Sequence, residues 1–180
     1  MRATSGALPK WSAGPIGLAV LGVDQLTKSW VGSAFGPGQE RRGVAVLGDV
    51  LEVRYVENRG AAFGMLRGES LILSLLAISL TVGLLIYFWR LEVAPVATIA
   101  GVGLIIGGAV GNLADRLRMG FVVDFISVGA WPTFNLADSA ITIGVAFLAF
   151  SLLRDEQPRP ARSRDVGLGA ITRSGRSVDG

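Results

Sequence analysis

The sequence predicts an α-helical polytopic membrane protein with four transmembrane helices and a small extracytoplasmic β-strand subdomain. Of its 180 residues, 51% are hydrophobic and 17% are charged, whereas about 25% are charged in a typical soluble domain. The mean hydropathy is +0.53. Two segments, about 70–89 and 93–114, contain no charged residue. Each is long enough to cross a hydrocarbon layer roughly 30 Å thick.

The other two helices are predicted over about 13–34 and 136–153, and each carries charge near one end. Asp24 and Lys28 lie toward the end of the earlier segment, and Asp138 lies near the start of the later one. A secretory signal peptide is the alternative for 13–34. No small-residue cleavage pattern follows it, however, and the polar segment DQLTK continues the helix. We therefore expect this segment to cross the membrane as well.

The β-strand subdomain is predicted in the loop of about residues 35–69, which joins the first two helices. Leu51, Val53 and Tyr55 alternate there with Glu52 and Arg54. This period of two is typical of a short strand with one buried face. We expect a small sheet to lie over one end of the helices.

The chain divides into a membrane domain over 1–153 and a basic tail over 154–180. The tail is rich in Arg, Pro, Ser and Gly, a composition typical of disorder. Four crossings place both termini on one side of the membrane. That side holds nine Lys and Arg residues, and the opposite loops hold seven. The bias is weak and favours cytoplasmic termini and a cytoplasmic tail.

Cysteine and histidine are both absent from the chain. Their absence excludes disulfides, thiolate or imidazole metal sites, cysteine nucleophiles and any triad that needs an imidazole base. Catalysis would have to use carboxylates, hydroxyls, amines or amides. The net charge of +3 is spread along the chain without an aromatic and basic module, so we expect no nucleic-acid partner.

Polar residues gather at one end of the predicted helices. Successive helices cross the membrane in alternating directions. With this alternation, the polar residues of the first, third and fourth helices lie near the outer surface, and two loops contribute further polar residues on that side. These residues are Asp24, Gln25, Lys28, Asn58, Asn112, Asp115, Arg116, Asp124, Asn135 and Asp138. Burying polar groups in a membrane is expensive, so a shared functional site is the hypothesis that this pattern favours.

Some of these residues have simpler explanations. Asp24 and Lys28 are four residues apart, which suits an ion pair on one helix, and Asp115 and Arg116 suit solvated positions at the headgroups. Three glycines at a spacing of four favour close helix packing. They are Gly103, Gly107 and Gly111.

Two carboxylates are harder to explain in this way. Asp124 lies within the apolar segment FVVDFI, and Asp138 lies within FNLADSAI at the start of the last helix. A lone carboxylate in such a place is costly. Two carboxylates that meet can share one proton, so that one acts as a base toward water and the other as an acid toward a carbonyl. Independent structural roles for the two residues remain the alternative.

Five segments of the chain resemble the lipoprotein signal peptidases, the type II signal peptidases of bacteria, which are membrane aspartic peptidases. They stand in the family's order and span residues 24–141. The segments are DQLTK (24–28), VENRGAAFGM (56–65), GGAVGNLADR (107–116), FVVDFI (121–126) and FNLADSAI (134–141).

The resemblance implies that Asp124 and Asp138 are the catalytic pair of an aspartic endopeptidase. It implies no cofactor and no metal. It also implies polar residues around the pair that bind substrate or support the site. These are Asp24, Lys28, Asn58, Asn112, Arg116 and Asn135.

The substrate implied by the resemblance is a bacterial prolipoprotein whose lipobox cysteine carries diacylglyceryl, and cleavage takes place just before that cysteine. The cysteine that this chain lacks would thus belong to its substrate. The implied location is the bacterial inner membrane, with membrane lipid as a partner and the active site near the outer surface. We expect a monomer.

Two other functions remain open from the residues alone. Intramembrane Asp, Lys and Arg residues also build proton- or ion-coupled carriers, although charges at one helix end and the lack of repeat symmetry argue against one. A non-enzymatic protein that binds lipid or a partner helix would explain the glycines. It would leave Asp124 and Asp138 without a purpose.

Overall fold

The structure is a computed structural model that describes residues 8–40, 43–48, 50–59 and 69–155. Most of the predicted tail therefore lies outside the described residues. A short 3-10 helix, η1 (Lys10–Ser12), opens the described chain. The helices and strands that follow, in chain order, are α1 (Ala13–Phe35), β1 (Gly43–Leu47), β2 (Leu51–Asn58), α2 (Glu69–Arg90), α3 (Val96–Met119), β3 (Val122–Val128) and α4 (Leu136–Asp155).

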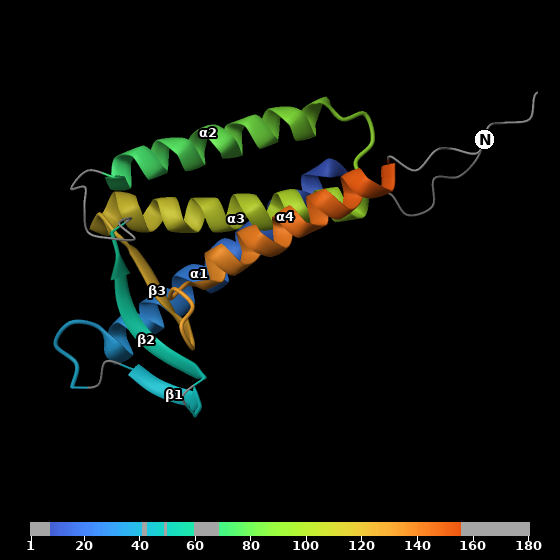
Figure 1. The fold of residues 1–180 in the computed structure, drawn as a ribbon. Helices are drawn as coiled ribbons and strands as arrows, with labels where there is room; N and C mark the ends of the chain where they lie inside the picture. Colours follow the sequence, from blue (N-terminus) through green and yellow to red (C-terminus); the bar gives the residue numbers. More distant parts are fainter. Residues whose placement is uncertain (1–7, 41–42, 49, 60–68, 156–180) are drawn as a thin grey trace, which may run out of the picture.

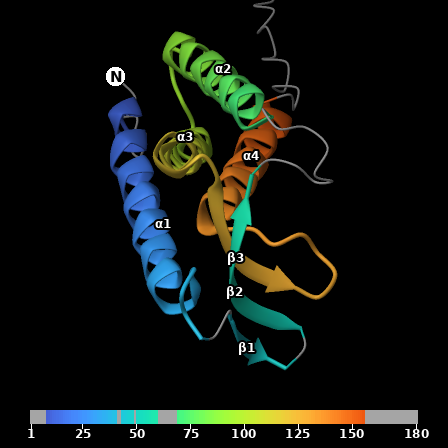
Figure 2. The same ribbon diagram turned by 90° about the vertical axis from the view of Figure 1, so that its left-hand side faces the viewer.

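The helices lie beside one another with the sheet at one end, which we call the sheet end (Figure 1). The last turns of α1 and α3 and the first turn of α4 lie there. Figure 2 shows α3 between the other three helices. Helix α3 packs against α1 and α4 along much of its length and less extensively against α2. The sheet end therefore brings together segments that are far apart in the sequence.

Helices and a small sheet are both present, as the sequence predicts. In the described part of the chain, two helical segments are long and apolar enough to cross a membrane: Val96–Met119 and Leu136–Arg154, with mean hydropathies of 1.8 and 1.9. The apolar stretch recognised in α2, Ile78–Arg90, is shorter. Helix α1 carries Asp24 and Lys28, and such charges lower the apolar character of a helix. The crossing of all four helices stays a prediction at this point.

Glycines allow α3 to approach its neighbours backbone to backbone. A Cβ atom added to Gly107 would lie 2.5 Å from the carbonyl oxygen of Gly17 on α1. A Cβ atom on Gly108 would lie 2.5 Å from the carbonyl oxygen of Ala137 on α4. Real Cβ atoms do not approach so closely, so a larger residue at either position would push the helices apart. The predicted role of the α3 glycines in close packing is confirmed.

The sheet has the strand order β1-β2-β3, and both pairs of strands are antiparallel. Strand β2 contains the alternating segment that the sequence identified. Strand β3 was not predicted, because a continuous apolar run does not distinguish a buried strand from other buried segments. A cluster of Val31, Phe35 and Phe125 packs α1 against β3, and Tyr55 of β2 packs onto it. This apolar contact fixes the sheet to α1.

Candidate active site

Asp124 lies in the middle of β3 with an exposed fraction of 2%. The antiparallel register places Val56 of β2 opposite it. Asn58, two residues further along β2, donates from Nδ2 to Asp124 Oδ2 at 2.8 Å. Asn135 Nδ2 donates to the other oxygen, Oδ1, at 2.7 Å. Both oxygens of this buried carboxylate therefore accept hydrogen bonds from amides.

Burial raises the pKa of Asp124 from 3.8 to about 6, because removal from water disfavours the charged form. The nearby carboxylate of Asp138 adds to this shift. The hydrogen bonds from Asn58 and Asn135 and the charge of Lys28 oppose it. Asp124 is therefore a carboxyl group that takes up a proton more readily than an exposed aspartate does.

Asp138 occupies the first turn of α4, where Asn135 caps the helix. Asn135 Oδ1 accepts a hydrogen bond from the backbone N–H of Asp138 at 2.9 Å. In return, Asp138 Oδ2 accepts one from the backbone N–H of Asn135 at 3.3 Å. This reciprocal pattern is a capping box with Asn and Asp in the two positions. A carboxylate in the first turn also interacts favourably with the helix dipole.

Asn112 of α3 reaches the same carboxylate from a second helix. Its Nδ2 donates to Asp138 Oδ1 at 2.7 Å. Its Oδ1 accepts hydrogen bonds from Lys28 Nζ at 2.9 Å and from Asn135 Nδ2 at 3.2 Å. Since two donors face the oxygen of this amide, its nitrogen must point toward Asp138. The orientation of Asn112 is set by its neighbours.

Lys28 is buried between two carboxylates. Its Nζ lies 2.8 Å from Asp24 Oδ2 and 2.7 Å from Asp115 Oδ2. Asp24 Oδ1 accepts the backbone N–H of Ala137, in the first turn of α4, at 3.0 Å. This ionic cluster thus joins α1, α3 and α4. Within the described residues no three acidic side chains gather in a way that would hold a metal ion.

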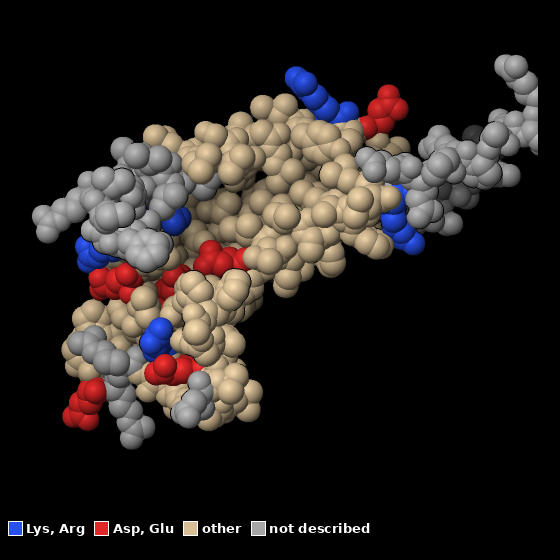
Figure 3. Space-filling model, viewed as in Figure 1, with Lys and Arg blue, Asp and Glu red and all other residues tan. Residues whose placement is uncertain are grey.

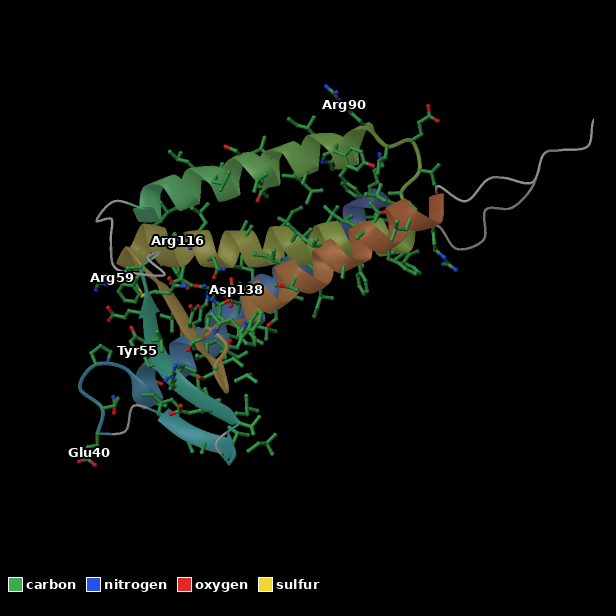
Figure 4. The ribbon with its side chains drawn as sticks, viewed as in Figure 1. Glu40, Tyr55, Arg59, Arg90, Arg116 and Asp138 are labelled. Carbon is green, nitrogen blue, oxygen red and sulfur yellow. The ribbon has the colours of Figure 1, made fainter. Side chains whose placement is uncertain are left out.

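Seven of the eight predicted site residues belong to one connected network of hydrogen bonds and ion pairs. They are Asp24, Lys28, Asn58, Asn112, Asp124, Asn135 and Asp138. Arg116 lies near the network but at its edge. Within the described chain, its guanidinium makes one long hydrogen bond, at 3.5 Å, to the backbone oxygen of Asn112. Figure 4 shows Arg116 and Asp138 at the sheet end, and Figure 3 shows acidic side chains gathered between the helices and the sheet.

Asp115 and Gln25, which the sequence places at this end without a role in the site, also belong to this network. Asp115 has an exposed fraction of 2%, so a solvated headgroup position for this residue is wrong. Gln25 donates from Nε2 to Asp115 Oδ1 at 2.9 Å, and its own oxygen accepts a hydrogen bond from Arg118 at 3.1 Å. One signal was available in the sequence, because Asp115 follows Asn112 by three residues and so lies on the same helix face.

The sequence matches the family described as signal peptidase (SPase) II over residues 16–154. The chain belongs to the signal peptidase II family. A lipoprotein signal peptidase of Syntrophomonas wolfei is 44% identical over 138 residues, which cover 77% of this chain and 90% of that protein. One of Halothermothrix orenii is 39% identical over 140 residues, which cover 78% of this chain and 94% of that protein.

The fold of this family member also matches solved structures. A bacterial membrane enzyme determined by the in meso method at 1.9 Å resolution has a TM-score of 0.71 and a sequence identity of 31%, over 79% of this chain and 93% of that one. A second such enzyme, determined at 2.3 Å, has a TM-score of 0.69 and an identity of 28%. The chain therefore has the membrane-enzyme fold of the signal peptidase II family.

Membership of the family confirms two predictions from the sequence. The first is the resemblance itself, and the second is the function, removal of signal peptides from prolipoproteins by a peptidase. Neither the carrier nor the non-enzymatic binding protein is favoured by these similarities.

Proposed function

We propose that this peptidase is an aspartic endopeptidase in which Asp124 and Asp138 form the catalytic pair. The observation that carries the proposal is the position of Asn135. Its side chain donates to Asp124 Oδ1 and accepts from the backbone of Asp138. The backbone N–H of Asn135 donates to Asp138 Oδ2 at 3.3 Å. Asn135 therefore contacts both carboxyl groups, Asp124 through its side chain and Asp138 through its backbone, and its exposed fraction is 0%.

The two carboxyl groups differ in burial. Burial raises the pKa of Asp124 to about 6, so this group holds the shared proton more readily. Asp138 is partly exposed, so its carboxylate is the one that a water molecule can reach. We assign Asp124 as the acid and Asp138 as the base in the resting enzyme. The proton belongs to the pair as a unit once the two titrate together.

The reaction that follows from this assignment needs only water and the peptide. Ionised Asp138 takes a proton from a water molecule while the oxygen of that water attacks the scissile carbonyl carbon. Protonated Asp124 gives its proton to the carbonyl oxygen. The tetrahedral intermediate collapses when the C–N bond breaks. The leaving nitrogen takes the proton from Asp138, and a hydroxyl proton of the intermediate returns to Asp124. Both carboxyl groups regain their starting states.

The remaining polar residues position this pair. Asn58 and Asn112 hold one carboxyl group each, and Lys28 sets the orientation of Asn112 through its oxygen. Asp24 neutralises part of the charge of Lys28 and caps α4. Arg116 lies at the edge of the network, where it contacts the substrate backbone. None of these residues has to transfer a proton in the proposed reaction.

We propose further that all four helices of the membrane domain, 1–153, cross the bacterial inner membrane. The termini and the basic tail, 154–180, are cytoplasmic, and the sheet end is at the outer surface. The start of α1 and the end of α4 lie at the opposite end of the helices from the sheet, which supports this orientation (Figure 1). The substrate is a prolipoprotein with diacylglyceryl on its lipobox cysteine. The enzyme acts as a monomer surrounded by membrane lipid.

The experiment that tests this function follows cleavage by mass. Purified protein in detergent is incubated with a diacylglyceryl-modified prolipoprotein and with its unlipidated form. The variants are Asp124→Asn and Asp138→Asn, and Glu40→Gln serves as the control because Glu40 is an exposed carboxylate away from the site. We expect wild type and control to cut the lipidated form just before its cysteine, and both Asp variants to be inactive although folded.

Two results would contradict the proposal. Cleavage by either Asp variant at the wild-type rate would remove that residue from the catalytic pair. Equal cleavage of the lipidated and unlipidated forms would show that diacylglyceryl is not recognised. Thermal unfolding of each variant in detergent separates loss of catalysis from loss of folding.

A further inference from the structure

The sheet carries a group of exposed apolar residues at the turn between β1 and β2 and at the turn after β3. We call it the apolar tip. It consists of Val46, Leu47, Val50, Val128 and Trp131. Leu47 has an exposed fraction of 65% and Trp131 one of 70%. A continuous apolar patch of this kind on a protein surface marks an interaction site.

The tip is a single ordered surface built from two neighbouring turns. Val50 N–H donates to the oxygen of Leu47 at 3.0 Å and closes the turn between β1 and β2. Trp131 N–H donates to the oxygen of Val128 at 2.9 Å and closes the turn after β3. Gly129 N–H donates to the oxygen of Val50 at 2.9 Å and joins the two turns. These apolar side chains are therefore presented together.

Polarity changes along the sheet from the tip to the other end of β2. That other end carries Asn58 and an exposed ion pair, in which Arg59 lies 2.7 Å from Glu57. In Figure 1 the β1–β2 turn points back along the helices, to about the level at which α4 begins, whereas the Asn58 end lies beside the end of α3.

We propose that the apolar tip inserts into the interfacial layer of the lipid bilayer, at the same surface as the catalytic pair. The inference deepens the proposed function and rests on its membrane orientation. A lipid surface fits better than a protein partner, because the β1 side chains of Val44, Ala45, Val46 and Leu47 are exposed on both faces of the strand. Protein partners usually cover one face of an edge strand, whereas lipid surrounds both.

The chemistry of the tip also sets how deep it goes. Trp prefers the level of the lipid headgroups, because its apolar ring can contact lipid there while its N–H stays hydrated. The tip therefore sits at the headgroups and upper acyl chains and goes no deeper.

Insertion of the tip has a consequence for catalysis. Val128 of the tip and Asp124 lie on the same strand, four residues apart, and Leu51 pairs with Val128 across the sheet. A strand rises about 3.3 Å per residue, so the tip and the carboxylate are held at a set separation. By resting on the bilayer, the tip fixes the depth of Asp124 relative to a lipid-anchored peptide.

The test measures depth directly and uses the fact that the chain has no cysteine. Single variants Leu47→Cys and Glu40→Cys are labelled with a nitroxide in the full-length protein, reconstituted in bilayer discs of phosphatidylglycerol and phosphatidylethanolamine. Collision rates with oxygen, which concentrates in lipid, and with a water-soluble nickel chelate are then compared. We expect the label at Leu47 to favour oxygen and the label at Glu40 to favour nickel, by several-fold in each case.

Two outcomes would overturn the proposal. A Leu47 label as open to nickel as the Glu40 label would place the tip in water. A Leu47 label shielded from both reagents would show a protein contact, from a second copy or from the prolipoprotein. The same labels in an Asp124→Asn background report depth without any cleavage. Failure of the depth measurement is therefore separate from failure of the proposed peptidase mechanism.

Discussion

Helices α1, α3 and α4 are held together by two kinds of contact, polar contacts at the sheet end (the polar level) and glycine backbone contacts further along the helices (the glycine level). At the sheet end, carboxylates, amides and one ammonium group connect them, as between Lys28 and both Asp24 and Asp115. One or two turns away, the same helices meet through glycine backbones, as between Gly107 and Gly17. Gly111 marks the boundary, since a Cβ atom there would lie 2.7 Å from Asp24 Oδ2.

The difference separates what the fold needs from what the reaction needs. Close packing of glycines brings helices together without burying any charge, and van der Waals contact drives it. Buried ion pairs are weak evidence for stability, because desolvation offsets much of the attraction. The polar level is therefore best explained by the catalytic pair that it holds. Changes at the polar level should alter catalysis, and they should also lower stability where a buried charge loses its partner. Changes at the glycine level should alter stability alone.

The largest expected effect comes from the catalytic pair itself. Asp138→Asn keeps the shape of the side chain but cannot accept a proton from water. We expect the specific cleavage rate to fall by about 10⁴-fold, the upper end for loss of general acid–base catalysis. A single-turnover assay on the lipidated prolipoprotein measures it. A fall of less than tenfold would contradict the proposed role.

Removal of Lys28 should destabilise the protein most. Lys28→Met leaves two buried carboxylates uncompensated, and breaking a buried ion pair in this way costs about 3–5 kcal/mol. Unfolding in denaturant with the protein in detergent measures this loss.

The matched control for Lys28→Met is Arg59→Met. Its ion pair with Glu57 has a similar distance, but the Arg59 side chain is 70% exposed. Exposed pairs contribute about 0–1 kcal/mol. Equal losses for the two variants would show that burial of the Lys28 cluster does not matter to stability.

The pH dependence of cleavage should follow the protonation of Asp124. Its pKa is raised to about 6, so the protonated form that acts as the acid predominates below that pH and is lost as the pH rises. We expect kcat/KM to fall roughly 50-fold between pH 6 and pH 8. The control is Glu40→Gln, whose profile should match wild type. A rate that rises over this range would reverse the assignment of acid and base.

At the glycine level, Gly107→Val should weaken the fold and leave catalysis intact. The added methyl groups meet the Gly17 backbone of α1, and overpacking of this kind costs about 1–3 kcal/mol. The melting temperature should drop, while the rate per folded molecule should stay within a factor of two or three of wild type. A large loss of specific rate would show that the glycine contacts also set the geometry of the polar level.

The smallest effect is expected on α2, which packs less closely. A Cβ atom on Gly83 would meet nothing within 4 Å. Gly83→Ala should therefore raise stability by about 0.5–1 kcal/mol through higher helix propensity. Gly108→Ala on α3 is the contrasting variant, because its Cβ atom would meet the Ala137 oxygen at 2.5 Å. A gain for both variants would remove the distinction between the two helices.

The sequence by itself determined the helices and the residues that gather at one end of them. Hydropathy is a local property, so uncharged runs such as 70–89 identify helices without any knowledge of their neighbours. The alternation at Leu51, Val53 and Tyr55 predicted β2 in the same way. The direction of each helix in turn was enough to place Asn112 near Asp138.

Only the tertiary structure decided how these residues contact one another. The strand β3 exists because β2 pairs with it, and that pairing brings Asn58 to Asp124. The burial of Asp115 depends on how α1 packs against α3, because Lys28 and Gln25 of α1 contact its carboxylate. Such contacts join residues up to 113 positions apart, as for Ala137 and Asp24. No local pattern of hydropathy or spacing contains that information, because it arises from packing between elements.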